Sequence, residues 1–144
     1  MDDGDAGGEG AERREYSSGT EWEEAFNYSR AVRVGDTVRV SGTTAVDDGE
    51  TVAPNDAGAQ AAFVYDRIGE ALGEVGAAPA DVVAVRAYVT DVGDTEPVAT
   101  AHRDFFAEAG RGVRPAMTLV EVSGLVRPDL VVEIEADAVV ADGD

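Results

Sequence analysis

Hydrophobic and polar residues alternate along five stretches of the chain, and this alternation predicts five β-strands. The stretches are residues 29–34, 37–46, 82–90, 114–125 and 130–140. The first two flank the turn Gly35-Asp36, so residues 28–46 are predicted to form a β-hairpin.

Two further segments place apolar residues three and four positions apart, which is the spacing of an amphipathic helix. The first opens at Pro54-Asn55-Asp56, where an Asn or Asp side chain can cap it, and ends at Gly76. The second begins at Asp94 or Thr95. The order ββαβαββ predicts an α+β domain in which both helices pack on one face of a mixed sheet.

The last strand predicts that the two faces of this sheet differ, because successive side chains point to opposite sides. Its aliphatic positions share one face, while Glu133, Glu135 and Asp137 share the other. Strand 82–90 carries Arg86 and Tyr88 opposite a wholly apolar set: Val83, Val85, Ala87 and Val89. A mixed face of this kind is either exposed to solvent or buried in a subunit interface that holds a site, and we favour the interface.

The first fifteen residues lack such patterning. Residues 1–15 are rich in Gly, Asp and Glu, so we expect a disordered acidic tail followed by a single domain over 16–144. No apolar run approaches the ~20 residues of a membrane span, and the N-terminus has no apolar signal-peptide core. A cytoplasmic protein without a membrane partner is therefore expected.

Charge narrows the choice of partners. Thirty acidic residues face eleven basic ones, for a net charge of −19, and all eleven bases are arginine. Such a surface repels nucleic-acid phosphates, so no nucleic-acid partner is expected. The excess acid and the absence of lysine favour a halophilic protein, although a GC-rich genome would also replace lysine by arginine.

Several kinds of catalytic site are excluded by composition. The chain has no cysteine, which rules out thiol catalysis, and His102 is its single histidine, too few for a multi-histidine metal site. It has neither a phosphate-binding glycine loop nor a G-x-S-x-G nucleophile elbow. No cofactor or metal is expected.

Three segments together resemble the RidA family of YjgF-like proteins. They are FNYSRAV at 26–32, VSGTTAV at 40–46 and RPAMTLVEVSGLVRPDLVVEIEADAVV at 114–140. The resemblance implies a chorismate-mutase-like fold, a homotrimer and a small-molecule ligand held in clefts between neighbouring subunits. Archetypal members hydrolyse enamines and imines derived from amino acids and release ammonia.

The resemblance also implies particular site residues. The family's arginine that grips the substrate carboxylate falls on Met117, and its water-positioning glutamate falls on Glu135. Backbone groups near Gly42 and Leu119 would line the pocket, and Tyr28 would form one wall.

Met117 is the main departure from the family pattern, because a methionine cannot make the charge-assisted grip of an arginine. Arg114 lies three residues earlier, so strand parity places it on the opposite face. Arg86 is a better replacement, although it could equally form an ion pair with Glu133 or Glu135, and the two roles are compatible.

These residues leave two functions open. We favour a trimeric metabolite-binding protein that is not an archetypal 2-iminoacid deaminase. The alternative is an enamine or imine deaminase in which Glu135 positions water and Arg86 grips the substrate. His102 and Ala99 stand where the family often has Tyr and Asn; His102 fits a proton shuttle or a plain surface residue, and Trp22 either covers the cleft or only packs.

The net charge of −19 generates a prediction about salt. The melting temperature should rise steadily from low to molar KCl, because the Debye length shrinks to ~3 Å at 1 M and the acidic side chains then cease to repel one another. Thermal unfolding followed by circular dichroism measures this, with a neutral solute that does not screen charge as the control. A flat or falling curve contradicts the halophilic interpretation.

Overall fold

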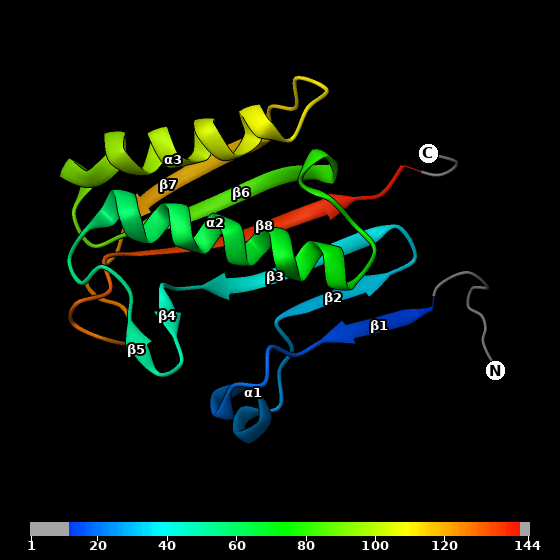
Figure 1. Ribbon diagram of the computed structural model, residues 1–144, viewed down its shortest axis with the longest axis horizontal. Coiled ribbons are helices and arrows are strands. Elements are labelled where there is room, and N and C mark those ends of the chain that lie inside the picture. The colour runs from blue at the N-terminus through cyan, green and yellow to red at the C-terminus, as the bar shows by residue number, and fades with distance from the viewer. Residues whose placement is uncertain (1–11, 142–144) are drawn as a thin grey trace.

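A six-stranded sheet forms the centre of the molecule in the computed structural model, which describes residues 12–141 (Figure 1). The strands, in spatial order, are β1 (Arg13–Tyr16), β2 (Ala31–Val34), β3 (Thr37–Thr43), β8 (Val132–Val139), β6 (Val82–Val89) and β7 (Ala116–Glu121). All neighbours are antiparallel except β6 and β7, which are parallel, so the sheet is mixed. A two-stranded hairpin is separate from it: β4 (Val46–Asp47) and β5 (Glu50–Thr51).

Two long helices, α2 (Ala57–Glu74) and α3 (Thr95–Glu108), lie side by side over one face of the sheet (Figure 1). Asp56 caps α2, since its side chain accepts a hydrogen bond from the Ala59 amide at 3.1 Å. The predicted α+β architecture, with two helices on one face of a mixed sheet, is confirmed. No helix in residues 12–141 has both the length and the apolar character to cross a membrane.

The hydrophobic core lies between α2 and the central strands. Alternate residues of β8 are buried there, as strand parity predicted: Val132, Ile134, Ala136 and Ala138. They pack with the buried α2 residues Val64, Ile68 and Leu72 in the same core. Glu133, Glu135 and Asp137 consequently point to the face of the sheet that α2 and α3 do not cover, which we call the open face.

The expectation of a disordered tail over residues 1–15 is wrong at its C-terminal end. Arg13–Tyr16 forms β1, which pairs with β2, while residues 1–11 lie outside the described part of the chain. One arginine from each of these two strands also binds a backbone carbonyl at the C-terminal end of α2, which helps to hold the pair in place. Arg14 donates to the Glu74 carbonyl at 3.5 Å, and Arg33 of β2 donates to the Val75 carbonyl at 3.0 Å.

The parity predicted for the strand at 82–90 is wrong at its first residues. Val82 is buried and Val83 is 48% exposed, because the register against β8 shifts between Val82 and Ala84. Such a β-bulge inserts one residue and reverses the faces before it. From Val85 onward the predicted alternation holds.

Candidate functional site

Charged side chains meet at the centre of the open face. Arg86 of β6 lies directly across from Glu135 of β8, and Arg39 of β3 lies across from Asp137 of β8. Tyr88 follows Arg86 on the same face of β6. We call these five residues the Arg86 cluster. Cross-strand pairing therefore assembles the cluster from three neighbouring strands.

Short hydrogen bonds hold the Arg86 cluster together. Arg86 Nε donates to Glu135 Oε1 at 2.5 Å, and Arg86 Nη2 donates to Asp137 Oδ2 at 3.1 Å. The Tyr88 hydroxyl donates to the same Glu135 oxygen at 2.8 Å. Arg39 Nε is more distant, at 3.5 Å from Asp137 Oδ1. The ion-pair role that the sequence allowed for Arg86 is thus confirmed, with Glu135 and not Glu133 as the partner.

These contacts set the protonation states of the cluster. Burial tends to raise the pKa of Glu135, but hydrogen bonds from Arg86 and Tyr88 and the positive charge of Arg86 outweigh it and lower that pKa. The hydrogen bond to Glu135 raises the pKa of Tyr88 and of Arg86. The carboxylate therefore stays ionised and the tyrosine stays protonated at neutral pH.

A depression of about 470 Å³ lies beside the cluster on the open face. Its lining combines charged, hydroxyl and aliphatic groups: Val32, Arg39, Val40, Ser41, Arg86, Glu135 and Asp137. Exposed valines lie on the same face, including Val34, Val120 and Val139. The depression offers both polar contacts and apolar walls to a small molecule.

Glu133 occupies a different environment on the same strand. Its side chain fills the space that a side chain at Gly42 would need, since a Cβ built there would lie 2.0 Å from Glu133 Oε2. Burial raises the pKa of Glu133, opposed by Arg30 and reinforced by the negative charge of Glu135. No hydrogen-bond donor within residues 12–141 contacts this carboxylate, so only the charge of Arg30 opposes the effect of burial on its pKa.

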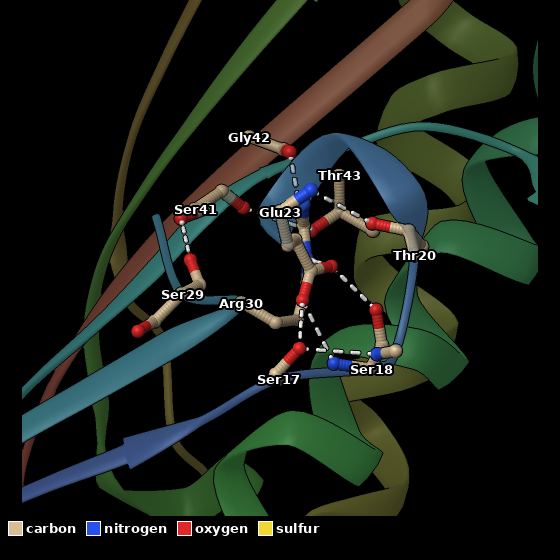
Figure 2. Close-up of polar contacts among 10 residues, drawn as sticks. Ser17, Ser18, Thr20, Glu23, Ser29, Arg30, Ser41, Gly42 and Thr43 are labelled. Atoms are coloured by element: carbon tan, nitrogen blue, oxygen red, sulfur yellow. Dashed lines mark hydrogen bonds and ion pairs between the residues drawn. The ribbon is translucent and has the colours of Figure 1, made fainter. Parts of the chain in front are cut away.

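A second network fixes the backbone beside Gly42 (Figure 2). Glu23 of the short helix α1 (Glu21–Phe26) is only 2% exposed. It accepts hydrogen bonds from Ser17 Oγ at 2.7 Å, from the Ser18 amide at 2.9 Å and from Arg30 Nε at 3.2 Å. Arg30 Nη1 in turn donates to the Gly42 carbonyl at 2.6 Å. The buried ion pair therefore joins α1 to β3 at the edge of the candidate site.

The serine hydrogen bonds also determine the ionisation of Glu23. Burial tends to raise its pKa, but the bonds from Ser18 and Ser17 and the charge of Arg30 lower it overall. The pKa values of Glu23 and Glu133 thus shift in opposite directions, because Glu23 accepts several hydrogen bonds whereas Glu133 accepts none from the described residues.

The structure brings only some of the sequence-predicted site residues together. Within one chain Arg86 and Glu135 touch, and Gly42 contacts Glu133. Tyr28 is exposed, with the Arg30 guanidinium 5.8 Å from its ring centre. Met117 and Leu119 pack against the hydrophobic core, so within one chain they do not reach the Arg86 cluster.

The two residues whose roles the sequence left open are also placed. His102 shares a 2.7 Å hydrogen bond with the Tyr65 hydroxyl between α2 and α3, and burial lowers its pKa. It is therefore part of the helix packing, on the far side of the sheet from the open face. Trp22 lies on the surface of α1 against Phe26 and not in the core.

Comparison with known proteins gives consistent matches over nearly the whole chain. The profile of the Ribonuc_L-PSP family, endoribonuclease L-PSP, matches residues 19–140. The chain is 35% identical over 113 residues to the RutC family protein PYRAB12510 of Pyrococcus abyssi, covering 77% of this chain and 84% of that protein.

Two solved structures extend the comparison. Rv2704 from Mycobacterium tuberculosis, a member of the YjgF/YER057c/UK114 family, is 44% identical with a TM-score of 0.79, and the match covers 90% of this chain and 100% of that one. TdcF from E. coli, solved with bound serine, is 28% identical with a TM-score of 0.73, covering 79% of this chain and 88% of that one. The fold implied by the sequence resemblance is confirmed.

The raised pKa of Glu133 predicts a pH-dependent effect on stability. Because the folded pKa lies above 4.5, the folded protein binds more protons than the unfolded chain just above pH 4.5, and the free energy of unfolding falls as pH rises through that interval. Glu133→Gln should therefore be more stable than wild type at neutral pH, and the gain should vanish below about pH 4.5.

Glu135→Gln, two residues along the same strand, is the matched control with the opposite sign. Its folded pKa is lowered, so this variant should be less stable at neutral pH and should approach wild type as pH falls. Urea unfolding at fixed salt between about pH 4 and pH 8 measures both variants. A loss of stability in Glu133→Gln at neutral pH contradicts the assignment.

Proposed function

Since the chain belongs to the endoribonuclease L-PSP family of YjgF-like proteins, we propose that this RidA-like protein assembles as a homotrimer and binds a small metabolite in clefts between subunits, without archetypal 2-iminoacid deaminase activity. The proposal places the open face of the sheet in the subunit interface. It also keeps RNA out of the cleft, because a net charge of −19 repels phosphates.

The observation that carries the proposal is the composition of the open face. An internally paired charge cluster, Arg86 with Glu135 and Asp137, lies among exposed valines. Charged groups that become buried in an interface must be paired and hydrogen-bonded, and these already are. Exposed aliphatic residues grouped around such a cluster are typical of a surface that another chain covers.

Small-molecule binding is supported by two further observations. The depression on the open face offers a polar ligand Ser41 and four members of the Arg86 cluster: Arg39, Arg86, Glu135 and Asp137. The related protein TdcF was solved with bound serine, a small polar metabolite. A neighbouring subunit placed over the depression would enclose such a ligand and exclude water from it.

Two features argue against archetypal imine hydrolysis. Met117 stands at the family's arginine position and packs against the core, so this position provides no guanidinium for a substrate carboxylate. Arg86 already donates to Glu135 and Asp137, and a substrate carboxylate would have to displace one of them. The charge-assisted hydrogen bonds that the reaction needs are therefore missing at position 117, and at Arg86 they would compete with the bonds to Glu135 and Asp137.

A second candidate, an enamine or imine deaminase, is favoured by Glu133. In that reaction water adds across the imine bond, its oxygen to carbon and one proton to nitrogen. The remaining hydroxyl proton then moves to nitrogen, and ammonia leaves as the carbonyl forms. Glu135 was the sequence candidate for positioning the water, but its Oε1 already accepts hydrogen bonds from Arg86 and Tyr88. Glu133 has a raised pKa and no hydrogen-bond donor among residues 12–141, so it suits proton transfer better, and Arg86 would bind the substrate carboxylate.

Assembly is tested by mass in solution. Light scattering at high salt should give three times the chain mass of 14.9 kDa, because the paired cluster and the surrounding valines favour burial of the open face. Val120→Glu, which adds an unpaired charge to that face, should reduce the mass, whereas Val126→Glu in an exposed loop serves as control. A stable wild-type monomer at micromolar concentration removes the intersubunit cleft.

Turnover is tested with 2-iminobutanoate and 2-iminopropanoate. We expect the wild type to hydrolyse them at least about tenfold more slowly than an archetypal deaminase assayed alongside. Each ~1.4 kcal/mol of transition-state stabilisation lost with the arginine–carboxylate contact slows the reaction tenfold. Efficient turnover that Arg86→Ala abolishes would instead establish the deaminase, with Arg86 as the grip. Glu133→Gln and Glu135→Gln, compared in that case, would identify the carboxylate that positions water.

A further inference from the structure

The outer surface of α1 carries two large exposed aromatic side chains. Trp22 is 61% exposed and Phe26 is 64% exposed, and their ring centres lie 4.9 Å apart. We call this pair the aromatic patch. Adjacent aromatic rings left in water are costly on a free surface, and Trp in particular is enriched where another chain docks.

The aromatic patch is held rigidly although α1 has only six residues. Thr20 caps the helix through a hydrogen bond from the Glu23 amide, and Asn27 ends it in the left-handed conformation. Glu23, on the inner side, is fixed by Ser17, Ser18 and Arg30 (Figure 2). Binding of a partner would therefore cost little conformational entropy in α1.

Charge indicates what kind of partner fits the patch. Glu21 and Glu24 are exposed on the same helix, so the aromatic rings lie in an acidic setting. A cation above the face of a tryptophan ring is attracted to it, and arginine also stacks on such rings and pairs with carboxylates. The expected occupant is an arginine side chain.

Two arginines can provide it, because neither makes an ion pair or donates a side-chain hydrogen bond within residues 12–141. Arg111 and Arg114 lie in the exposed loop between α3 and β7. The other nine arginines, all within residues 12–141, each make an ion pair or donate a hydrogen bond. Cations without a partner in the described part of the chain are unusual at a net charge of −19, and Arg111 and Arg114 are three positions apart.

The loop and the patch cannot meet within one chain. α1 follows β1 at one edge of the six-stranded sheet, whereas the loop precedes β7 at the opposite edge (Figure 1). Two different patches of identical chains can meet head-to-tail, and such contacts form a ring when the rotation from one subunit to the next closes. A trimer is one such ring.

We propose that the aromatic patch of one subunit receives Arg114, with Arg111 beside it, from the α3–β7 loop of the next subunit. The guanidinium lies against Trp22 and pairs with Glu24 or Glu21. This inference rests on the homotrimer of the proposed function and adds to it the residues that join one subunit to the next.

Trp22 makes the contact directly observable, because it is the single tryptophan of the chain. In the assembled protein its emission should be shifted to the blue and weakly quenched by acrylamide. Arg114→Glu should weaken association about tenfold, the combined effect of a lost cation–π contact and a lost ion pair, and should expose Trp22 to the quencher. Arg103→Glu makes the same charge change on the exposed surface of α3 and should alter neither readout.

Charge exchange separates a direct contact from an indirect effect. Glu24→Arg combined with Arg114→Glu should restore both association and protection of Trp22. A wild-type trimer whose Trp22 is quenched as fast as free tryptophan overturns this contact but leaves the proposed assembly standing. A wild-type mass of one chain overturns both. Failure of the double variant to recover, when Arg114→Glu alone weakens association, overturns the pairing.

Discussion

The register of β8 between β3 and β6 is the constraint on which both faces of this protein depend. β8 is hydrogen-bonded on both sides, and its alternate residues are either buried aliphatics or carboxylates. A slip of one residue would exchange the two sets and bury the acidic side chains under α2. The same register places Arg86 opposite Glu135 and Tyr88 opposite Glu133. Core packing and site geometry therefore have one common origin.

The carboxylates of Glu23 and Glu133 show how their surroundings in this fold give the same chemical group opposite pKa shifts. Glu23 is almost fully buried yet remains ionised, because two serines and an arginine hydrogen-bond to it. Glu133 accepts no hydrogen bond from residues 12–141, and its pKa moves in the opposite direction. The donors thus outweigh burial at Glu23, whereas burial prevails at Glu133.

The parts of the molecule that the sequence predicted are those governed by local periodicity. The alternation of β8, the α2 spacing with a cap at Asn55 or Asp56 and the pairing of Arg86 with a β8 glutamate were all predicted from residue order, and the structure assigns the cap to Asp56. β1 was missed, because its four residues are mostly polar and are stabilised by backbone pairing and by carbonyls at the end of α2. The inward packing of Met117 and the proximity of Glu133 to Gly42 depend on contacts between distant segments, which periodicity does not report.

Gly42 has a consequence for the placement of the acid on the neighbouring strand. A Cβ at residue 42 would lie 2.0 Å from the carboxylate oxygen of Glu133 and 3.0 Å from its carboxyl carbon. The two residues lie 91 positions apart in the sequence, on neighbouring strands of one sheet. The conflicting atoms are the far end of a flexible side chain, so Gly42→Ala would be relieved by the carboxylate turning aside while the backbone stays in place. The glycine therefore leaves room for the acid, and replacing it would relocate a negative charge without disrupting the sheet.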